Sequence, residues 1–346
     1  MKDIDKKDKL VSIVIPCRNE VNYIENLLKS IIDSDYSLDL IEILIIDGLS
    51  DDGTRELIIE NYSSKNKNIT LVDNLKQKTP FAFNLGINKS SGDYIIILGA
   101  RHAISKNYIS EVVDILHKNK EIGCVGGRVD NVYENKISEV ISTAMASPFG
   151  IGFSNFRSIK VDSYVDSIGS PAFRKGVFKE LGCFDERLTR NQDDDFSYRL
   201  IKSGYKILLK SNISVKYNVR ASFYKLYTQY KQYGYWKVFV NRKHKTVTTL
   251  RQLFPMFFIL SLFVLTLLSF VFSAFIYLLV FELAIYTMLN LFFALKDNGL
   301  NLMNVFMQMY TCLILHISYG LGYLEGIYDF VLLKKLPNEK NEKLSR

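Results

Sequence analysis

Three adjacent carboxylates, Asp193, Asp194 and Asp195, stand within residues 185–200 at the predicted start of a helix. Adjacent carboxylates repel one another, so a ligand or a helix N-terminus has to offset that cost. Capping the helix would need only one of them. A carboxylate can also accept the proton of an attacking hydroxyl group. The cluster therefore predicts a general base, with helix capping alone as the competing interpretation.

A second set of polar residues follows two short hydrophobic runs, within residues 12–20 and 42–54. Each run is rich in β-branched residues and ends in turn-forming residues, as buried parallel strands do when they deliver a ligand-binding loop. The segment between them repeats apolar residues at helical spacing. These residues are Val21, Ile24, Leu27, Leu28, Ile31 and Ile32. The pattern predicts strand, helix, strand, which is half of a nucleotide-binding fold, although ordinary turns also use Asp and Gly.

A third set begins at Thr79 and Pro80, a plausible helix start, and continues into a predicted buried strand over residues 94–98. Arg101 and His102 follow that strand. A guanidinium and a protonated imidazole can hold phosphate oxygens through charge-assisted hydrogen bonds. The same two residues could equally be ordinary loop residues.

These motifs together resemble family 2 glycosyltransferases with the GT-A fold, over about two thirds of the chain, through residue 236. The resemblance implies a Rossmann-like α/β nucleotide-binding domain, similar to succinoglycan-type exopolysaccharide glycosyltransferases. It also implies a set of residues that bind the nucleotide-sugar donor. That set is Pro16, Arg18, Glu20, Asp47, Asp52, Lys78, Asn84, Arg101 and His102.

The chain departs from the family pattern at two places. The family's metal-binding Asp-x-Asp reads Ala100-Arg101-His102 here, so a divalent cation, Mn or Mg, would have His102 as its one offered ligand. Positive charge from Arg101 and His102 could instead replace the metal, and both alternatives stay open. The family's Glu-Asp pair reads Gln192-Asp193, which implies Asp193 as the base and Gln192 as an acceptor contact.

Other acceptor contacts implied by the resemblance are Gly169, in an acceptor-side turn, and Gln232 and Trp236. The last two resemble the Gln-x-x-Arg-Trp element of polysaccharide synthases, with Tyr235 in place of the Arg. An indole ring can stack on a sugar face. Gly169 could be a plain turn glycine, and the lone Trp could instead lie at a membrane interface.

Apolar residues are concentrated near the C-terminus. Residues 253–281 contain no charge, and after Glu282 the apolar run continues to Leu295. A bilayer core of about 30 Å needs about 20 apolar residues in a helix, so residues 253–295 fit a tight pair of spans. Residues 302–324 are a weaker third candidate. A buried soluble hairpin is the competing interpretation for residues 253–295.

Charge predicts the orientation of this membrane segment. Residues 197–279 contain 13 Lys or Arg residues and no acid, which places the large N-terminal part in the cytoplasm. The tail after residue 333 is also basic and favours an even number of spans, whereas hydropathy counts three. Residues 1–10 are charged throughout and predict no secretory signal peptide.

The expected domains are a glycosyltransferase domain at 1–236, a basic linker at 237–252, two or three membrane or interfacial helices at 253–333, and a basic tail at 334–346. The four widely spaced cysteines fit a reducing compartment. No nucleic-acid module is recognisable, so nucleic acid is a poor interpretation of the basic segment.

The resemblance implies inverting transfer of a sugar from a nucleoside diphosphate-sugar, UDP-sugar being expected, to a polyprenyl-linked glycan acceptor in exopolysaccharide, capsule or cell-wall synthesis. Two alternatives stay open: a processive polysaccharide synthase, and a non-catalytic partner that binds nucleotide-sugar.

Overall fold

The computed structural model describes residues 9–152, 161–219, 222–248 and 250–337. The chain divides into two compact units. The first comprises Met1–Val132 and Ile159–Asn218, and the second comprises Tyr133–Ser158 and Val219–Arg346. The main chain therefore leaves the first unit after Val132, returns to it at Ile159 and leaves it again after Asn218. These boundaries differ from the expected division at residue 236.

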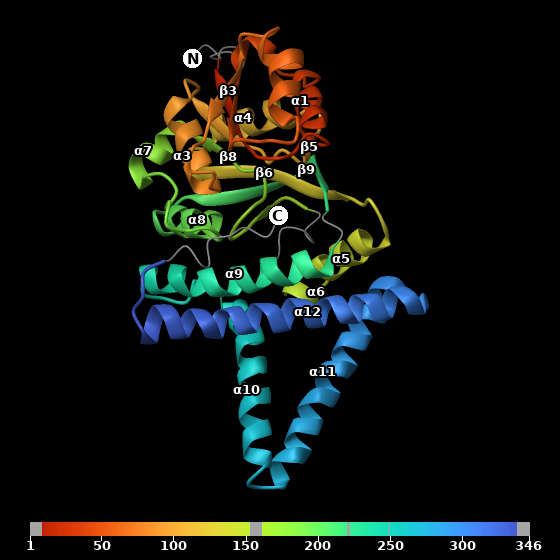
Figure 1. The fold of residues 1–346 in the computed structure, drawn as a ribbon. Coiled ribbons are helices and arrows are strands. Elements are labelled where there is room, and N and C mark those ends of the chain that lie inside the picture. The colour runs from red at the N-terminus through yellow and green to blue at the C-terminus, as the bar shows by residue number, and fades with distance from the viewer. Residues whose placement is uncertain (1–8, 153–160, 220–221, 249, 338–346) are drawn as a thin grey trace. The chain divides into compact units, whose positions relative to one another are not determined.

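The first unit is built on one mixed sheet, which has nine strands among the described residues, in the order β3-β2-β1-β4-β8-β6-β9-β5, with β7 paired to β9 (Figure 1). The α/β class expected from the sequence is confirmed. The strands are β1 Val11–Cys17, β2 Ile41–Asp47, β3 Ile69–Asp73, β4 Tyr94–Ile97, β5 His102–Ile104, β6 Ile122–Val132, β7 Ser163–Tyr164, β8 Ala172–Arg174 and β9 Lys206–Asn218.

The strands β1, β2, β3 and β4 run parallel to one another. Cys17 lies opposite Asp47 in the register of β1 and β2, and Asp47 lies opposite Asp73 in that of β2 and β3. On the other side of β1, Val14 lies opposite Ile97 of β4. Because parallel strands end at a common edge, the loops that follow all four strands leave the sheet together.

The helices of the first unit cover this sheet with apolar faces. In α1, the buried residues Ile24, Leu27, Leu28 and Ile31 confirm the helical spacing expected between the two strands. The helix α3 begins at Thr79 with Pro80 in its first turn, as the sequence predicts. The helices are α1 Ile24–Ile32, α2 Thr54–Ile58, α3 Thr79–Lys89, α4 Tyr108–Lys118, α7 Lys175–Leu181 and α8 Gln192–Lys202, with η2 Leu38–Leu40 and the π-helical turn η3 Ile59–Ser63.

The second unit is helical in its described part. Three of its segments are long and apolar enough to cross a membrane, namely Leu250–Ser269, Ala274–Asn298 and Leu302–Leu332. The basic linker expected at 237–252 lies partly within the long helix α9. The helices are α5 Lys136–Ala146, α6 Pro148–Ile151, α9 Phe223–His244, α10 Phe254–Ser269, α11 Ala274–Asn298 and α12 Leu302–Gly326, with η4 Leu250–Leu253 and the π-helical turn η5 Ile327–Leu332.

The contact of α3 with β1 gives a test of this packing. A Cβ atom at Gly86 would lie 2.3 Å from Val14 Cγ1, whereas a Cβ at Gly176 in α7 would meet nothing within 4 Å. We expect Gly86→Ala to destabilise the chain by about 1–3 kcal/mol, because the strand has to move away. We expect Gly176→Ala to be neutral or stabilising by up to ~1 kcal/mol. Thermal unfolding of the full chain in detergent measures both, and equal effects would contradict the packing.

Candidate functional site

The common edge of β1, β2, β3 and β4 gathers most of the residues that the sequence singles out as ligand-binding. Asp47 ends β2 and is fully buried. Its carboxylate accepts hydrogen bonds from the Ser50 amide at 2.9 Å, the Ser50 hydroxyl at 2.5 Å and Arg55 Nη1 at 2.7 Å. The protein itself therefore supplies the partners of Asp47, and no donor contact is needed to explain its burial.

Arg55 links Asp47 to a second acid that the sequence analysis missed. Its Nη1 also lies 2.8 Å from Asp73 Oδ1, and about half of the Asp73 side chain is exposed. The hydrogen bonds to Asp47 and then to Asp73 raise the pKa of the Arg55 guanidinium. Asp73 is thus the solvent-facing carboxylate of this trio. Its only signal in the sequence is its place at the end of a short apolar run.

Asp52 ties the loop after β2 to the loop after β1. Its carboxylate accepts hydrogen bonds from the amides of Val21, at 3.3 Å, and Thr54, at 3.1 Å, and from the Thr54 hydroxyl. Burial acts to raise the pKa of Asp52, but these hydrogen bonds outweigh it and the pKa is lowered. The Thr54 hydroxyl in turn accepts from the Glu20 amide at 3.0 Å. Asp52 thus braces the two loops, and the donor contact expected of it stays a prediction.

Two further predicted donor residues lie in the same edge region. Pro16 is half-buried near the end of β1, opposite Ile46 of β2. Arg18 follows that strand, and its side-chain stem passes so close to Gly48 that a Cβ there would lie 3.2 Å from Arg18 Cδ. The loops after β1 and β2 therefore pack tightly on each other.

Arg101 is held by residues of the loop after β1. Its Nε donates to Glu20 Oε2 at 2.8 Å, and its guanidinium carbon lies 4.3 Å from the centre of the Tyr23 ring. The Glu20 contact uses one of the five N–H donors of the guanidinium. The structure thus brings together Glu20 and Arg101, two residues that the sequence predicts as donor-binding from positions 81 residues apart.

His102 faces two groups that occupy its Nδ1 atom. The Gly99 amide donates to Nδ1 at 3.0 Å, and the Ser170 hydroxyl lies 3.0 Å from the same atom. A neutral imidazole whose Nδ1 accepts from an amide carries its proton on Nε2. Nε2 is then a hydrogen-bond donor, which suits a phosphate oxygen, whereas a metal requires a lone pair. The predicted acceptor residue Gly169 directly precedes Ser170 in the chain, so this contact brings Gly169 near His102.

The described side chains at this edge do not by themselves form a site for a divalent cation. Among the described residues there is no group of three or more His, Cys, Asp or Glu side chains that could hold a metal ion. Ala100 offers no ligand atom, and Nδ1 of His102 is engaged by Gly99. The metal role considered for His102 in the sequence therefore finds no support in this arrangement.

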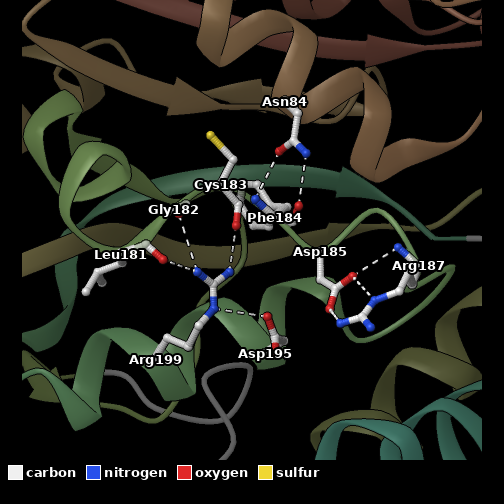
Figure 2. Close-up of polar contacts among 9 residues, drawn as sticks. All are labelled: Asn84, Leu181, Gly182, Cys183, Phe184, Asp185, Arg187, Asp195 and Arg199. Carbon is white, nitrogen blue, oxygen red and sulfur yellow. Dashed lines mark hydrogen bonds and ion pairs between the residues drawn. The ribbon is translucent and has the colours of Figure 1, made fainter. Parts of the chain in front are cut away.

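Asn84 braces the loop that leads to the acid cluster. Its amide nitrogen donates to the Phe184 carbonyl at 2.9 Å, and its amide oxygen accepts from the Phe184 N–H at 2.9 Å (Figure 2). The same nitrogen donates to Glu186 Oε1 at 2.9 Å. These bonds engage both ends of the Asn84 amide and position the loop, and the donor contact expected of Asn84 stays a prediction. Lys78 lies at the start of α3, and its carbonyl accepts from Asn74.

The side chain of Arg199, in α8, bonds to several backbone carbonyls of the same loop (Figure 2). It donates to the carbonyls of Leu181 at 2.6 Å, Gly182 at 3.4 Å and Cys183 at 2.8 Å. Its Nε also donates to the fully buried Asp195 at 3.1 Å. These carbonyls follow the end of α7, where helical partners are missing. One half-buried guanidinium therefore satisfies them and fixes the loop against α8.

Aromatic rings reinforce this attachment of the loop to α8. The ring of Phe184, in the loop, lies 4.8 Å from that of Phe196, in α8, and 4.9 Å from that of Phe83, in α3. Phe178 of α7 stacks on Phe196 at 5.1 Å. Such ring pairs contribute beyond the apolar area that they bury. The start of α8 is consequently set by α3 and α7 together.

The three acids of the first turn of α8 have different environments. Asp195 is buried and paired with Arg199, whereas Asp193 is exposed and Asp194 is half-buried. The preceding residue, Gln192, has a buried side-chain oxygen without a hydrogen-bond partner among the described residues. Buried polar atoms are normally paired, so this oxygen is a candidate ligand atom. Asp193 is the acid of the cluster most open to solvent.

The predicted acceptor residues Gln232 and Trp236 lie in the second unit, in α9. The Trp236 ring is fully buried against Tyr235, Phe239 and Phe330. Protein side chains therefore occupy the surroundings of the ring on which a sugar was expected to stack. In this structure the tryptophan serves the packing of α9.

Comparison with known proteins gives consistent results. Residues 12–182 match the family model described as "Glycosyl transferase family 2". The chain is 32% identical over 332 residues, 92% of this chain and 99% of the relative, to the dolichyl N-acetyl-alpha-D-glucosaminyl phosphate 3-beta-D-2,3-diacetamido-2,3-dideoxy-beta-D-glucuronosyltransferase of Methanococcus voltae. It is 30% identical over 247 residues, 70% of this chain and 74% of the relative, to the succinoglycan biosynthesis protein ExoA of Rhizobium meliloti.

Solved structures share the fold at lower identity. The mannosyltransferase PcManGT from Pyrobaculum calidifontis, in complex with GDP-Man and Mn2+, superposes with a TM-score of 0.59 at 15% identity, covering 94% of this chain and 89% of that one. GalNAc-T7 with UDP, GalNAc and Mn2+ gives a TM-score of 0.51 at 18% identity, covering 63% of this chain and 45% of that one.

The role of Arg199 can be tested by limited proteolysis. We expect Arg199→Lys to loosen the loop, because an ammonium cannot reproduce the planar fork that bonds three carbonyls and Asp195. A loss of about 2 kcal/mol in local stability corresponds to about 30-fold faster tryptic cleavage after Arg187 or Arg190. Mass spectrometry of the digests of the full chain measures the rate. Lys202→Gln on the same helix is the control, and equal cleavage of the two variants would refute the role.

Proposed function

Because the chain belongs to glycosyl transferase family 2, we propose that it transfers one sugar, with inversion, from a nucleoside diphosphate-sugar to a lipid-linked glycan acceptor at a membrane. The observation that carries this proposal is the exposed Asp193 at the start of α8, on a helix start that Arg199 and Asn84 hold in place. The mixed sheet, whose fold is similar to that of solved glycosyltransferase structures, supplies the side that binds the nucleotide-sugar donor.

Asp193 acts as the general base in this proposal. The acceptor oxygen attacks C1 of the donor sugar on the face opposite the diphosphate, the bond from C1 to the phosphate oxygen breaks, and the hydroxyl proton passes to the Asp193 carboxylate. Of the neighbouring acids, Asp195 is committed to Arg199 and buried. Asp193 combines exposure with a first-turn position, where the helix N-terminus stabilises the ionised form that a base requires.

Arg101 and His102 hold the leaving diphosphate in this proposal. Both follow β4 at the common edge, and the Gly99–Nδ1 hydrogen bond directs an Nε2 proton donor of His102 away from that amide. Guanidinium and imidazole donors recognise phosphate oxygens and stabilise the charge that develops as C1 separates from the diphosphate. The two neighbours named above, with GDP-Man and with UDP, are in line with a nucleoside diphosphate donor, and UDP-sugars are the first to test.

The acceptor side draws on Gln192 and on the membrane segments. The buried oxygen of Gln192 can accept a hydrogen bond from an acceptor hydroxyl beside Asp193. The name of the Methanococcus voltae relative specifies a dolichyl-linked sugar phosphate, and segments apolar enough to cross a membrane suit a lipid-linked substrate. The acid-free basic stretch at 197–279 favours a cytoplasmic catalytic unit.

Asp193→Asn tests the base. We expect at least a 100-fold fall in kcat with little change in the KM for the donor, because the amide cannot take the proton but fills the same space. Sugar transfer from a panel of nucleotide-sugars to polyprenyl-phosphate-linked sugars measures the effect. Asp194→Asn removes the same charge one residue away and should retain turnover within several-fold. Turnover by Asp193→Asn above a tenth of the wild-type rate would contradict the assignment.

Chelation tests the way the diphosphate is held. We expect transfer by the wild type to persist in excess EDTA, because Arg101 and His102 supply donors rather than metal ligands. His102→Gln, which retains an N–H donor, should keep more activity than His102→Ala. The effect of each variant is measured as kcat with and without added Mn2+. A 100-fold loss under EDTA that Mn2+ restores would show that a cation has the role proposed for these two residues.

A further inference from the structure

In the second unit, α9 and α12 pack side by side and parallel along most of their lengths (Figure 1). The sequence offset between contacting residues stays close to 90 from one end of the pair to the other. The contacts, from N-terminal to C-terminal, are Phe223 with Tyr310, Lys231 with Glu325, Tyr235 with Asp329, and Arg242 with the Lys335 carbonyl. Whatever environment surrounds α9 therefore also surrounds the paired part of α12.

Glycines bring these two helices into backbone contact. A Cβ at Gly322 would lie 1.9 Å from the Lys231 carbonyl oxygen, and one at Gly234 would lie 2.1 Å from the Tyr319 carbonyl oxygen. So close an approach leaves no space for lipid between the helices. The pair consequently behaves as one layer, which we call the α9–α12 platform.

The platform carries charges that hydrocarbon would not tolerate. The last turns of α12 and the residues after it contain Glu325, which pairs with Lys231 at 2.8 Å, and Asp329, which pairs with Lys335 at 2.8 Å. The side chains of Lys231 and Glu325 are each about 40% exposed. Charged groups in a bilayer core are costly, and exposed ones costliest. The C-terminal half of α12 therefore belongs in an aqueous or headgroup environment.

The hairpin formed by α10 and α11 has the opposite character. Its turn, residues 270–273, lies far from α12 (Figure 1), and Phe270, Val271 and Phe272 are exposed. The amides of these three residues donate to the carbonyls of Leu267 and Leu268, so the turn exposes little unsatisfied backbone. An apolar, internally bonded turn is what a bilayer permits.

The hairpin meets α12 near its own base. Pro255 and Ile259 of α10 approach Gly320, and Tyr286 and Asn290 of α11 bond to His316 and Met309. In a bundle of three spans, α12 would instead accompany α11 toward the turn. The part of α10 beyond Ile259, about 10 residues or roughly 15 Å of helix, thus projects from one side of the platform.

The unpaired side of α12 is apolar. Met303, Phe306 and Leu321 are each at least 39% exposed, and their spacing of 3 and 15 residues places them on one helical face. Such a face matches the boundary between headgroups and acyl chains, and the basic side chains of α9 match anionic headgroups.

We propose that the α9–α12 platform lies flat along one surface of the bilayer, and that the α10–α11 hairpin alone enters the hydrocarbon and returns to the same surface. The occupant of the exposed apolar faces is the lipid bilayer. α12 is then not a membrane span, although its composition qualifies it as one. The inference concerns the membrane surface that this unit binds and is independent of the reaction proposed above.

Accessibility of single cysteines tests this arrangement. In a full chain whose four native cysteines are replaced by Ala, Leu300→Cys marks the start of α12 and Leu336→Cys marks the segment after it. Tyr224→Cys marks the start of α9, and all three positions are at least 71% exposed. In sealed vesicles of known orientation, we expect an impermeant maleimide to label all three from the same face, with at least tenfold slower labelling from the other face.

Labelling of positions 300 and 336 from opposite faces would overturn the proposal, because α12 would then cross the bilayer. Should the cysteine-free chain fail to fold, epitope tags inserted after Gly299 and after Arg346 in the otherwise native chain give the same comparison by antibody access. Tags reached from one face support the flat platform, and tags reached from opposite faces refute it.

Discussion

The parallel pairing of β1 with β2 and β4 constrains everything that the first unit can bind. Because Cys17 lies opposite Asp47 and Asp47 opposite Asp73, three strands end level with one another, and their loops have to share one edge. Hydrogen bonds then join those loops: the Asp52 carboxylate accepts from the Val21 amide, and the Ser50 hydroxyl accepts from the Asn19 amide. A ligand at this edge meets a preformed rim, so little ordering entropy remains to be lost on binding.

Charges around this rim are balanced in local groups. Arg55 faces Asp47 and Asp73, Arg101 faces Glu20, and Arg199 faces Asp195. Each cation is thereby spared the cost of an unpaired partly buried charge. The balance also has a consequence for the proposed reaction. Because Glu20 neutralises much of the charge of Arg101, Arg101 would bind a diphosphate through directed N–H donors more than through net charge. Asp193 is exposed, as the proposed role of proton acceptor requires.

Much of this could be predicted from local sequence. The spacing of Ile24, Leu27 and Leu28 shows a helix without any knowledge of its partners, and the runs before Cys17 and Asp47 show buried strands. Contacts that depend on distant segments could not be predicted. The bond between Asn84 and Phe184 joins residues 100 positions apart, so nothing local distinguishes a bracing asparagine from a ligand-binding one.

The same limit explains the other differences. In the sequence, Arg55 follows a turn and resembles an ordinary helix residue. Only the register of the strands places Asp47 and Asp73 beside it. Trp236 is polar at one edge and apolar elsewhere, a composition that suits a sugar platform, a membrane interface or a core equally well. Its burial follows from the packing of Phe330, 94 residues later, against the same face of α9.

In the arrangement that we propose, hydropathy overestimates the number of spans for a related physical reason: it measures the composition of a segment and not what covers it. Only 11% and 17% of the first two candidate spans are buried by protein, whereas 56% of the third is buried. The apolar and small residues of α12 pack against other helices: Gly322 and Gly326 lie against α9, and Gly320 lies against α10. A helix whose apolar side chains already have protein partners gains less from entering lipid, while Glu325 and Asp329 would still oppose insertion. Sequence hydropathy therefore sets an upper limit on the number of spans.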